Sequence, residues 1–456
     1  MKDAHVWFAA IAAWSLPGCG DDGSDPSTTG DPTGASSGQN DSEGTGASTP
    51  PTTMTEATTV DDPTTEDVPT TGDPTADPST TDDPSTTDTG DPPPAAPGAV
   101  RVAVGGGWAC AVKPDGTVWC WGSNVYFSLG VTDAGIFQSE VPLQVGTASD
   151  YVSVGRGASC AVHASGGIDC WGPNIYGQSG NGAPGPDQVG PAPFGDFTDY
   201  VLQEQGANFN AGLRMDGTIW GAGQANGGYF GPDDADYAAL DVEQVLGDSW
   251  STFAVGAYFL CGVKQDGTMH CVGRQDVLAG NPAPDVCPAV GMCSRNLVQI
   301  GADTDWRSVN AGVQTAVVTA VKQDGSYWCW GVNNEASCGT GDMTNPVMPT
   351  KIGAASWHDV VTGDGQTCGV QTDGSLWCWG ANYAGQVGNG TMTPENVLAP
   401  VQIGADTDWA EVSPGYLTTC ARKTTGKVWC WGHGTEGQLG NGALENSATP
   451  VEVVGF

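Results

Sequence analysis

Residues 110–122 read Cys-Ala-Val-Lys-Pro-Asp-Gly-Thr-Val-Trp-Cys-Trp-Gly, and this phrase decides the fold because it recurs along the chain. Each copy places a glycine in a short turn between two β-prone runs. The seven turn glycines, spaced 50, 51, 50, 58, 49 and 52 residues apart, are Gly116, Gly166, Gly217, Gly267, Gly325, Gly374 and Gly426. A period near 50 residues with several short strands per repeat is typical of a propeller blade. The sequence therefore predicts an all-β, seven-bladed β-propeller.

The first repeat also predicts its own hairpin register. If Lys113 opposes Thr117, the loop has three residues, a length that favours a type I turn followed by a residue with positive φ. Proline presets the first turn position, and Gly116 can take the left-handed conformation without steric cost. This register places Cys110 opposite Cys120, at the Cβ separation that a disulfide requires.

Fourteen of the fifteen cysteines follow Cys19, and they test this register. In the third repeat both cysteine positions change together, to Ala211 and Gly221, as a bonded pair predicts. Zinc ligation is the alternative, but zinc sites usually show Cys-x2-4-Cys knuckles, which this chain lacks. The five predicted Cys-x9-Cys pairs are Cys110 with Cys120, Cys160 with Cys170, Cys261 with Cys271, Cys368 with Cys378, and Cys420 with Cys430.

Four further cysteines complete the predicted disulfide set. In the fifth repeat Thr319 faces Cys329, so Cys338, nine residues on, is the expected partner of Cys329. Cys287 and Cys293 lie in the extra residues that lengthen the fourth repeat. Each disulfide would add about 2–3 kcal/mol by the loop-entropy estimate. Seven disulfides indicate an oxidising compartment.

The N-terminus agrees with export. The apolar stretch 6–16 is too short to span a bilayer but suits a secretory signal. Residues 16–19 read Leu-Pro-Gly-Cys, which resembles a bacterial lipobox, although Pro17 stands where a small residue is usual. We expect residues 1–19 to be a signal peptide with lipidation at Cys19, which would anchor the protein to the cell envelope with surface exposure. Plain secretion and an accidental apolar start are the alternatives.

Residues 20–98 have a different composition. They are loose repeats of Asp, Pro, Thr, Ser and Gly with seventeen acidic residues and no basic one. Such a segment has almost nothing apolar to bury, so we expect a disordered linker. As a flexible coil it would span about 50 Å on average, which would hold a folded domain away from the lipid surface.

Residues 99–456 are expected to form one domain. That length is large for a single core, but a propeller grows by repetition. Strands such as 118–121 are apolar on both faces, which suits blades that lie between two neighbours. Most tryptophans are therefore interpreted as inter-blade packing. The domain begins and ends with strand-like runs, 99–104 and 450–454, and we expect the last strand to complete the first blade and so leave no free edge.

Further motifs resemble the RCC1 repeat. Its pattern runs Asp-Gly-x-x-Trp-x-Trp-Gly-x-Asn-x-x-Gly-Gln-x-Gly, of which 382–390 and 437–442 are good copies. The resemblance covers essentially all of 99–456 and is closest to secreted bacterial members, in which Cys-x9-Cys and Trp-Cys-Trp-Gly are frequent. It implies a seven-bladed propeller. The WD40 family is disfavoured because its Gly-His and Trp-Asp punctuation is missing from the sequence.

The resemblance also suggests an activity that the charge disfavours. The eponymous eukaryotic member is a chromatin-bound guanine-nucleotide exchange factor for a small GTPase. Residues 99–456 contain 34 Asp/Glu and 13 Lys/Arg, so their net charge is near −21. That charge repels a phosphate backbone, and an exported chain would not meet a GTPase. We therefore expect no nucleic-acid partner, and exchange activity is only an alternative that follows from the family.

The sequence contains no recognisable catalytic constellation. The histidines after the signal segment, His163, His270, His358 and His433, are scattered over four repeats. There is no P-loop lysine and no dinucleotide fingerprint. We expect no enzyme activity, no cofactor and no metal. An extracellular, glycan-active enzyme with paired carboxylates in the central funnel is the alternative.

One acidic element recurs, as Ala-Asp-Thr-Asp-Trp at 302–306 and again at 405–409. Asp-x-Asp can be part of a calcium site. No further acidic residue follows at the spacing of a calcium loop, so the preferred interpretation is a turn that leads into the next strand.

The leading hypothesis is a surface-anchored, monomeric, non-enzymatic binding module with an unknown protein or glycan ligand; a structural envelope component is a third alternative. Loops of a repeat scaffold can vary without damage to the core, and binding residues tend to lie there. The third repeat abandons the usual loop phrase for an aromatic and acidic segment, although drift of a degenerate repeat is the alternative. The candidate ligand-binding residues are Tyr229, Phe230, Asp233, Asp234, Asp236 and Tyr237.

Overall fold

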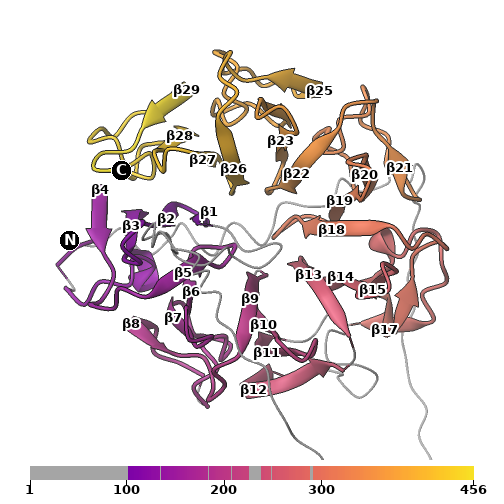
Figure 1. Ribbon diagram of the computed structural model, residues 1–456, viewed down its shortest axis with the longest axis horizontal. Coiled ribbons are helices and arrows are strands. Elements are labelled where there is room, and N and C mark those ends of the chain that lie inside the picture. The colour runs from indigo at the N-terminus through magenta and orange to yellow at the C-terminus, as the bar shows by residue number, and fades with distance from the viewer. Residues whose placement is uncertain are drawn as a thin grey trace, which may run out of the picture. The chain divides into compact units, whose positions relative to one another are not determined.

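The folded unit is a ring of seven antiparallel β-sheets, each with its first strand nearest the centre (Figure 1). The predicted seven-bladed β-propeller is therefore confirmed. The predicted signal peptide with Cys19 and the linker 20–98 lie outside the described residues. The computed structural model describes residues 101–456 except 134, 183, 207, 225–237, 248 and 288–290.

The blades, numbered 1 to 7 in chain order, each run from an innermost to an outermost strand. The innermost strands are β1 (Val102–Val104), β5 (Tyr151–Val154), β9 (Tyr200–Gln205), β13 (Trp250–Gly256), β18 (Trp306–Ala311), β22 (Trp357–Thr362) and β26 (Trp409–Pro414). The second strands are β2 (Trp108–Val112), β6 (Cys160–His163), β10 (Phe209–Arg214), β14 (Phe259–Lys264), β19 (Val317–Lys322), β23 (Gln366–Gln371) and β27 (Thr418–Lys423).

The outer half of each blade follows the same order. The third strands are β3 (Val118–Ser123), β7 (Ile168–Gly172), β11 (Ile219–Gln224), β15 (Met269–Arg274), β20 (Tyr327–Gly331), β24 (Leu376–Gly380) and β28 (Val428–Gly432). The fourth strands are β4 (Gln138–Gln144), β8 (Gln188–Pro193), β12 (Ala238–Leu246), β17 (Gly291–Gln299), β21 (Thr350–Lys351), β25 (Val397–Gln402) and β29 (Ser447–Glu452). Blade 4 adds a fifth strand, β16 (Asp285–Cys287), outside β17, and the short 3-10 turns are η2 (Val125–Phe127) and η3 (Gln275–Val277). No helix of the described part is long and apolar enough to cross a membrane.

The hairpin between the second and third strands has the predicted register. Lys113 N–H donates to the Thr117 carbonyl at 2.9 Å, which closes a three-residue turn. Gly116 takes a φ of +77°, and a Cβ at this position would collide with the backbone of the connection to the next blade. Both conditions favour glycine. Cys110 stands opposite Cys120, as the turn geometry predicts.

All fourteen cysteines of residues 101–456 are paired, in seven disulfides, so the predicted disulfide set is confirmed. The five Cys-x9-Cys pairs each cross one hairpin, with Cα atoms 4.0 to 4.1 Å apart. They join Cys110 to Cys120, Cys160 to Cys170, Cys261 to Cys271, Cys368 to Cys378, and Cys420 to Cys430.

The remaining two disulfides lie outside these hairpins. Cys287 bonds Cys293 in the insertion of blade 4, and Cys329 bonds Cys338 in blade 5. In blade 3, Ala211 faces Gly221 at the position of the missing pair. So many disulfides indicate an oxidising, extracytoplasmic environment.

The second tryptophan of each Trp-Cys-Trp phrase joins its blade to the preceding one. Trp431 on β28 is fully buried, and its Nε1–H donates to the Gln386 carbonyl of the blade 6 loop at 3.0 Å. A buried N–H without an acceptor costs about 1–3 kcal/mol, so this bond fixes where the loop must lie. The equivalent bonds run from Trp121 to Gln438, from Trp171 to Ser128, from Trp330 to Val277 and from Trp379 to Ser337.

The last glycine of the Gly-Gln-x-Gly phrase packs against the buried tryptophan indole of the next blade. Gly440 has a φ of +62°, and a Cβ there would lie 2.8 Å from Cδ1 and Nε1 of Trp121. Glycine satisfies both the backbone conformation and the close approach. The two recurrent phrases are therefore the two halves of one inter-blade contact, which confirms the interpretation of these tryptophans as packing residues.

Blades 3 and 4 lack the second tryptophan. Ala222 stands at its position in blade 3, and the side-chain amide of Asn210 donates to the Gln178 carbonyl at 2.9 Å instead. Val272 stands at the same position in blade 4. The contact between blades 2 and 3 thus keeps the hydrogen bond but loses the buried indole.

The ring does not close in the predicted way. The last strand, β29, pairs with β28 inside blade 7 and does not join blade 1. The prediction was wrong because residues 138–144 already supply the fourth strand of blade 1. Closure instead uses side chains, such as the Trp121–Gln438 bond and a hydrogen bond from Val104 N–H to Ser413 Oγ at 3.2 Å.

The outer strands pair with no further strand of their own sheets, and the loop of the preceding blade contacts several of them, as where Gly442 N–H donates to the Glu140 carbonyl of β4 at 2.9 Å. Proline interrupts their hydrogen-bonding capacity, which is a common protection against edge-to-edge association. The edge prolines are Pro142 in β4, Pro191 and Pro193 in β8, Pro400 in β25 and Pro450 in β29.

The antiparallel order gives the propeller two different faces. The hairpin face carries the turns between second and third strands and the connections to the next blade. The loop face carries the connections from first to second and from third to fourth strands. Its residues are 105–107, 124–137, 155–159, 173–187, 206–208, 257–258, 275–284, 312–316, 332–349, 363–365, 381–396, 415–417 and 433–446, as far as they are described.

The inter-blade contact can be tested by replacing Trp431 with phenylalanine. The change removes the hydrogen bond to Gln386 and part of the buried ring, so we expect a loss of about 2 kcal/mol in the free energy of unfolding. Chemical denaturation measures it. Trp429→Phe, on the same strand, is the matched control because Trp429 is half-buried and its Nε1 has no hydrogen-bond partner. Equal losses in the two variants would contradict the assigned contact.

Candidate functional site

The central channel, where an enzymatic site was the alternative expectation, is filled by an arginine. Arg156 of blade 2 places Nε 3.2 Å from Glu204 Oε1 and Nη2 3.5 Å from Asp359 Oδ2, on blades 3 and 6. The cavity that remains is lined by residues of all seven blades and has a volume of about 20 Å³. That is the space of roughly one water molecule, so a sugar ring does not fit.

The ionisable groups in this channel are buried. Burial raises the pKa of Glu204 to about 7, although the charge and hydrogen bond of Arg156 act in the opposite direction. Arg156 Nη1, Gln203 Oε1 and Gln205 Oε1 are buried without a hydrogen-bond partner. Strong pKa shifts can mark functional sites, but here the shifted group lies in a closed plug that ties three blades together.

On the hairpin face, the Asp-x-Asp element binds a lysine of the chain itself. Lys322 Nζ lies 2.8 Å from the carboxylates of Asp303 and Asp305. It also lies 4.8 Å from ring centroids of Trp306 and Trp328. Ion pairing and cation–π attraction therefore hold the ammonium in a cage of two carboxylates and two indoles.

Blade 7 repeats this lysine cage, with Lys423 Nζ 2.8 Å from Asp406 and 2.9 Å from Asp408. These four aspartates are the ones for which calcium was considered, and the structure uses them to neutralise lysine. Within the described ranges, no group of three or more His, Cys, Asp or Glu is arranged to hold a metal ion. Related cation contacts in other blades are Lys113 over Trp119, Arg214 bound to Asp199, and Lys264 over Trp250.

Blade 2 has a histidine at this cation position. His163 Nδ1 lies 2.8 Å from Asp150 Oδ1, and Nε2 lies 3.0 Å from Asp169 Oδ2. Because carboxylates only accept hydrogen bonds, both ring nitrogens must carry a hydrogen, so His163 is an imidazolium. Tyr151 also donates to Asp169, at 2.7 Å. The hydrogen bond to Asp169 and the weaker one to Asp150 raise the pKa of His163, while burial opposes the shift.

Exposed apolar side chains gather on the loop face. Of the twenty large apolar side chains that are exposed in the described part, twelve lie there, and two, Met215 and Val454, lie on the hairpin face. Single exposed apolar residues are ordinary, but their concentration on one face points to an interaction surface. The twelve are Val125, Tyr126, Phe137, Ile175, Tyr176, Met343, Val347, Met348, Tyr383, Met392, Tyr416 and Leu444.

Two carboxylates approach each other on this face. Asp364 lies in the turn between β22 and β23, and its Oδ1 accepts the Gln314 N–H at 2.8 Å. Glu335, from the blade 5 loop, places Oε2 2.1 Å from the position that a Cβ on Gly365 would occupy. Burial, with a smaller contribution from the charge of Glu335, raises the pKa of Asp364 to about 7. Burial also raises the pKa of Glu335.

Two tyrosines complete this cluster. Tyr383 from blade 6 and Tyr416 from blade 7 are 51% and 37% exposed. Burial raises the pKa of Tyr383, and Tyr416, Glu335 and Asp364 add to the shift, so the four groups are electrostatic neighbours. We call Glu335, Asp364, Tyr383 and Tyr416 the acidic-aromatic cluster.

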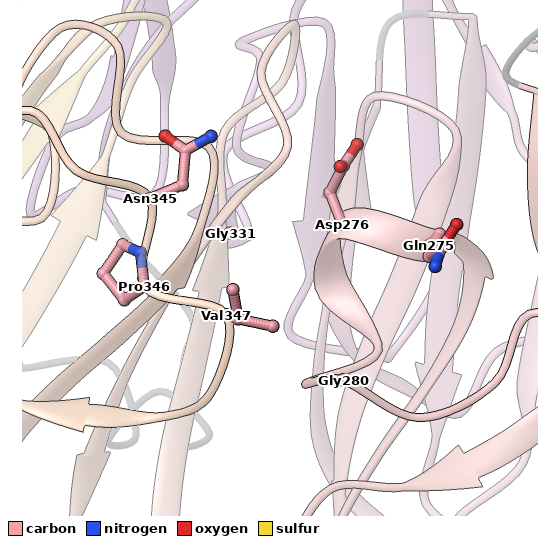
Figure 2. Close-up of a pocket in the computed structure, with 7 residues that line it drawn as sticks. All are labelled: Gln275, Asp276, Gly280, Gly331, Asn345, Pro346 and Val347. Carbon is pink, nitrogen blue, oxygen red and sulfur yellow. The ribbon is translucent and has the colours of Figure 1, made fainter.

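A groove of about 200 Å³ lies on the same face between blades 4 and 5 (Figure 2). In Figure 2, Gln275 and Asp276 stand on the η3 turn, opposite the loop that carries Val347. Two of its polar groups are already engaged, since Asp276 pairs with Arg274 at 2.6 Å and Asn345 Oδ1 accepts a backbone N–H at 2.7 Å. The lining residues are Gln275, Asp276, Gly280, Gly331, Asn345, Pro346 and Val347.

The predicted ligand-binding residues of the third repeat, Tyr229, Phe230, Asp233, Asp234, Asp236 and Tyr237, lie outside the described residues. The cysteine-clipped insertion of blade 4 is described as the hairpin β16–β17, which exposes Val286 and Met292. Sequence reasoning missed the acidic-aromatic cluster. A signal was available, because Tyr383 occupies a variable position of Asn-x-x-Gly at 382–385, and Glu335 occupies one in the equivalent Asn-x-x-Ala at 333–336.

Comparisons with known proteins agree with the fold. A family model described as "Regulator of chromosome condensation (RCC1) repeat" matches residues 373–422 and 425–456, and a second model of the same repeat matches 99–132 and 409–438. Human WBSCR16 has a similar structure, with a TM-score of 0.62 and 17% identity over 74% of this chain and 94% of that chain. Prp20p from Saccharomyces cerevisiae gives a TM-score of 0.59 and 19% identity over 69% of this chain and 80% of that chain.

The protein is therefore a repeat-built, disulfide-rich β-propeller. It has the fold of an RCC1-like propeller, and residues 99–132, 373–422 and 425–456 match the RCC1 repeat. At these identities the structural likeness extends to the fold only.

The His163 contact predicts a pH-dependent stability. The folded-state pKa is raised, so the stabilisation is fully present below the unfolded pKa of about 6.5 and is lost as pH rises through the folded pKa. Relative to His163→Gln, the wild type should be more stable by about 1–2 kcal/mol at pH 6, and the gap should narrow by pH 9. Urea denaturation at both pH values measures it. His163→Lys introduces a permanent cation like that of blade 5, so this variant should remain more stable than His163→Gln at pH 9. If the stability difference between the wild type and His163→Gln were independent of pH, the imidazolium would be contradicted.

Proposed function

We propose that this protein is an exported, surface-anchored binding module without catalytic activity, and that it binds a secreted protein or an envelope glycan on its loop face. The observation that carries this proposal is the concentration of exposed apolar side chains on that face. Core positions of the repeats are occupied by inter-blade contacts, which leaves the loops as the surface free to recognise a ligand.

The closed axis supports a non-enzymatic role. A glycan-active propeller enzyme needs a funnel that admits its substrate and two carboxylates at the bond to be cleaved. Here Arg156 occupies the channel, and the buried carboxylate of Glu204 faces this guanidinium. The groove between blades 4 and 5 offers a single carboxylate, Asp276, which is already paired.

The disulfides support the exported location, because seven structural disulfides persist only where thiols are not kept reduced. Lipidation of Cys19 would tether the domain through the 79 residues of 20–98. Such a tether would let the loop face reach a partner beyond the envelope surface.

Loop-face binding can be tested with a panel of purified envelope glycans and secreted proteins. A variant with Phe137→Ser and Ile175→Ser should lose at least tenfold in affinity for whichever panel member the wild type binds, because both side chains are exposed on the loop face. The control, Met215→Ser with Val454→Ser, makes the same chemical change on the hairpin face and should bind normally. Binding retained by the loop variant, or turnover of a panel glycan by the wild type, would contradict the proposal.

Anchoring can be tested separately with Cys19→Ala. If Cys19 is acylated, the wild-type protein partitions into the detergent phase on phase separation, and the variant is released into the soluble fraction or stalls during export. Fractionation with immunodetection measures the change. An identical distribution of both proteins would remove the lipid anchor and leave plain secretion.

A further inference from the structure

We propose that the loop face docks a basic polypeptide segment, and that a lysine side chain of this partner binds among Glu335, Asp364, Tyr383 and Tyr416. The inference rests on the proposed function, since it assigns a chemistry to the partner of the loop face. Charge, exposure and the way this chain binds its own lysines carry it.

The loop face is predominantly acidic, and among its nine carboxylates Asp276 is paired with Arg274 at the end of β15. Its described residues include nine Asp or Glu and a single Lys or Arg, Arg156, which is engaged at the axis with Glu204 and Asp359. A surface of one sign attracts a partner of the opposite sign and speeds its association. The nine acidic residues are Asp133, Asp187, Asp276, Glu335, Asp342, Asp364, Glu395, Glu436 and Glu445.

The hairpin face differs because several of its aspartates are paired with the chain's own cations, while others, such as Asp115 and Asp324, accept hydrogen bonds from a following Thr or Ser. Lys322 and Lys423 each bind two aspartates, and Arg214 binds Asp199 at 2.7 Å. On the loop face, Asp276 pairs with Arg274, but neither Glu335 nor Asp364 forms an ion pair with any described residue. Pairs of carboxylates bound to one lysine of the chain are therefore found on the hairpin face, whereas Glu335 and Asp364 have no such lysine.

The lysine cages show which ligand suits the acidic-aromatic cluster. In blade 5 the chain holds an ammonium group between two carboxylates at 2.8 Å and two aromatic rings at 4.8 Å. The cluster offers the same groups, two carboxylates and two aromatic rings, without a cation of its own. An ammonium ion gains from both at once, because carboxylates accept its hydrogen bonds and aromatic faces attract its charge.

The cluster is held in place by the framework of three blades. Asp364 N–H and the side-chain amide of Gln366 both donate to the Gly415 carbonyl, at 3.2 and 3.0 Å, and Gly415 directly precedes Tyr416. Gln366 is completely buried, and its Oε1 has no hydrogen-bond partner. The turns of blades 6 and 7 are thus fixed to each other, with an unsatisfied acceptor beside the turn that carries Asp364.

The raised pKa of Asp364, about 7, gives an independent readout. A bound ammonium favours the charged carboxylate and would lower this pKa. Binding at pH 7 should therefore release protons, which calorimetry detects as a dependence of the heat on the ionisation enthalpy of the buffer. Among the described residues, the groups that face Asp364 are Glu335, Tyr383 and the Gln314 N–H, so no basic group there accounts for such a release.

The proposal can be tested by titrating the full-length protein with a synthetic ten-residue peptide of alternating Lys and Gly at low ionic strength. Glu335→Gln combined with Asp364→Asn keeps the side-chain shapes and should weaken binding at least tenfold. Tyr383→Ala should also weaken it, whereas Tyr383→Phe, which keeps the ring face, should not. The charge-matched control is Asp196→Asn with Glu140→Gln, two exposed carboxylates outside the loop face, and it should bind within threefold of the wild type.

Carbodiimide cross-linking of the same peptide, followed by mass spectrometry, maps the contacted carboxylates. Enrichment at Glu335 or Asp364 supports the proposal; cross-links spread without enrichment over 20–98 and the rest of the domain overturn it. Equal affinity of the double variant and the control also overturns it. These two results concern only the lysine-binding proposal. Binding of a partner to the loop face is tested separately by the variant with Phe137→Ser and Ile175→Ser, which alters no charge.

Discussion

The structure depends on a hydrogen bond from a buried indole to the loop of the preceding blade. One four-stranded sheet cannot bury both of its apolar faces, so a blade is stable only between neighbours. Trp431 and its equivalents supply a large apolar surface together with one N–H that needs an acceptor. The acceptor loop can approach only where glycine replaces a side chain, as at Gly440. This pair of requirements explains why two phrases recur together and sets the position of each loop.

Because the core contacts are fixed in this way, the two faces can differ. On the hairpin face, short connections bring aspartates to a lysine, an arginine or His163 in blades 2, 3, 5 and 7. On the loop face, longer connections carry tyrosines and carboxylates that no turn requires. A charged ligand therefore meets internally neutralised pairs on one side and an acidic, partly apolar surface on the other. The division follows from connection length and needs no catalytic group.

Sequence alone predicted the features that depend on the residues of a single hairpin. The three-residue turn, the positive φ of Gly116 and the Cys110–Cys120 pairing all follow from residues that are close together in the sequence. The same holds for the disulfides of Cys170, Cys271 and Cys430. Ring closure was mispredicted, because it depends on which repeat supplies the fourth strand of blade 1. Glu335 and Asp364 were missed for a related reason: they come from different blades, and no spacing within one repeat reveals that they meet. The six candidate residues of the third repeat remain a prediction.

Blade 3 offers the most direct test of the indole contact and its disulfide brace, since Ala211, Gly221 and Ala222 replace the two cysteines and the second tryptophan. Native-state amide hydrogen exchange can compare its hairpin, β10–β11, with β23–β24 of blade 6, which retains Cys368–Cys378 and Trp379. If these contacts hold the blades, the amides of β10–β11 exchange faster, because less free energy opposes their opening. Equal protection of the two hairpins would contradict that view.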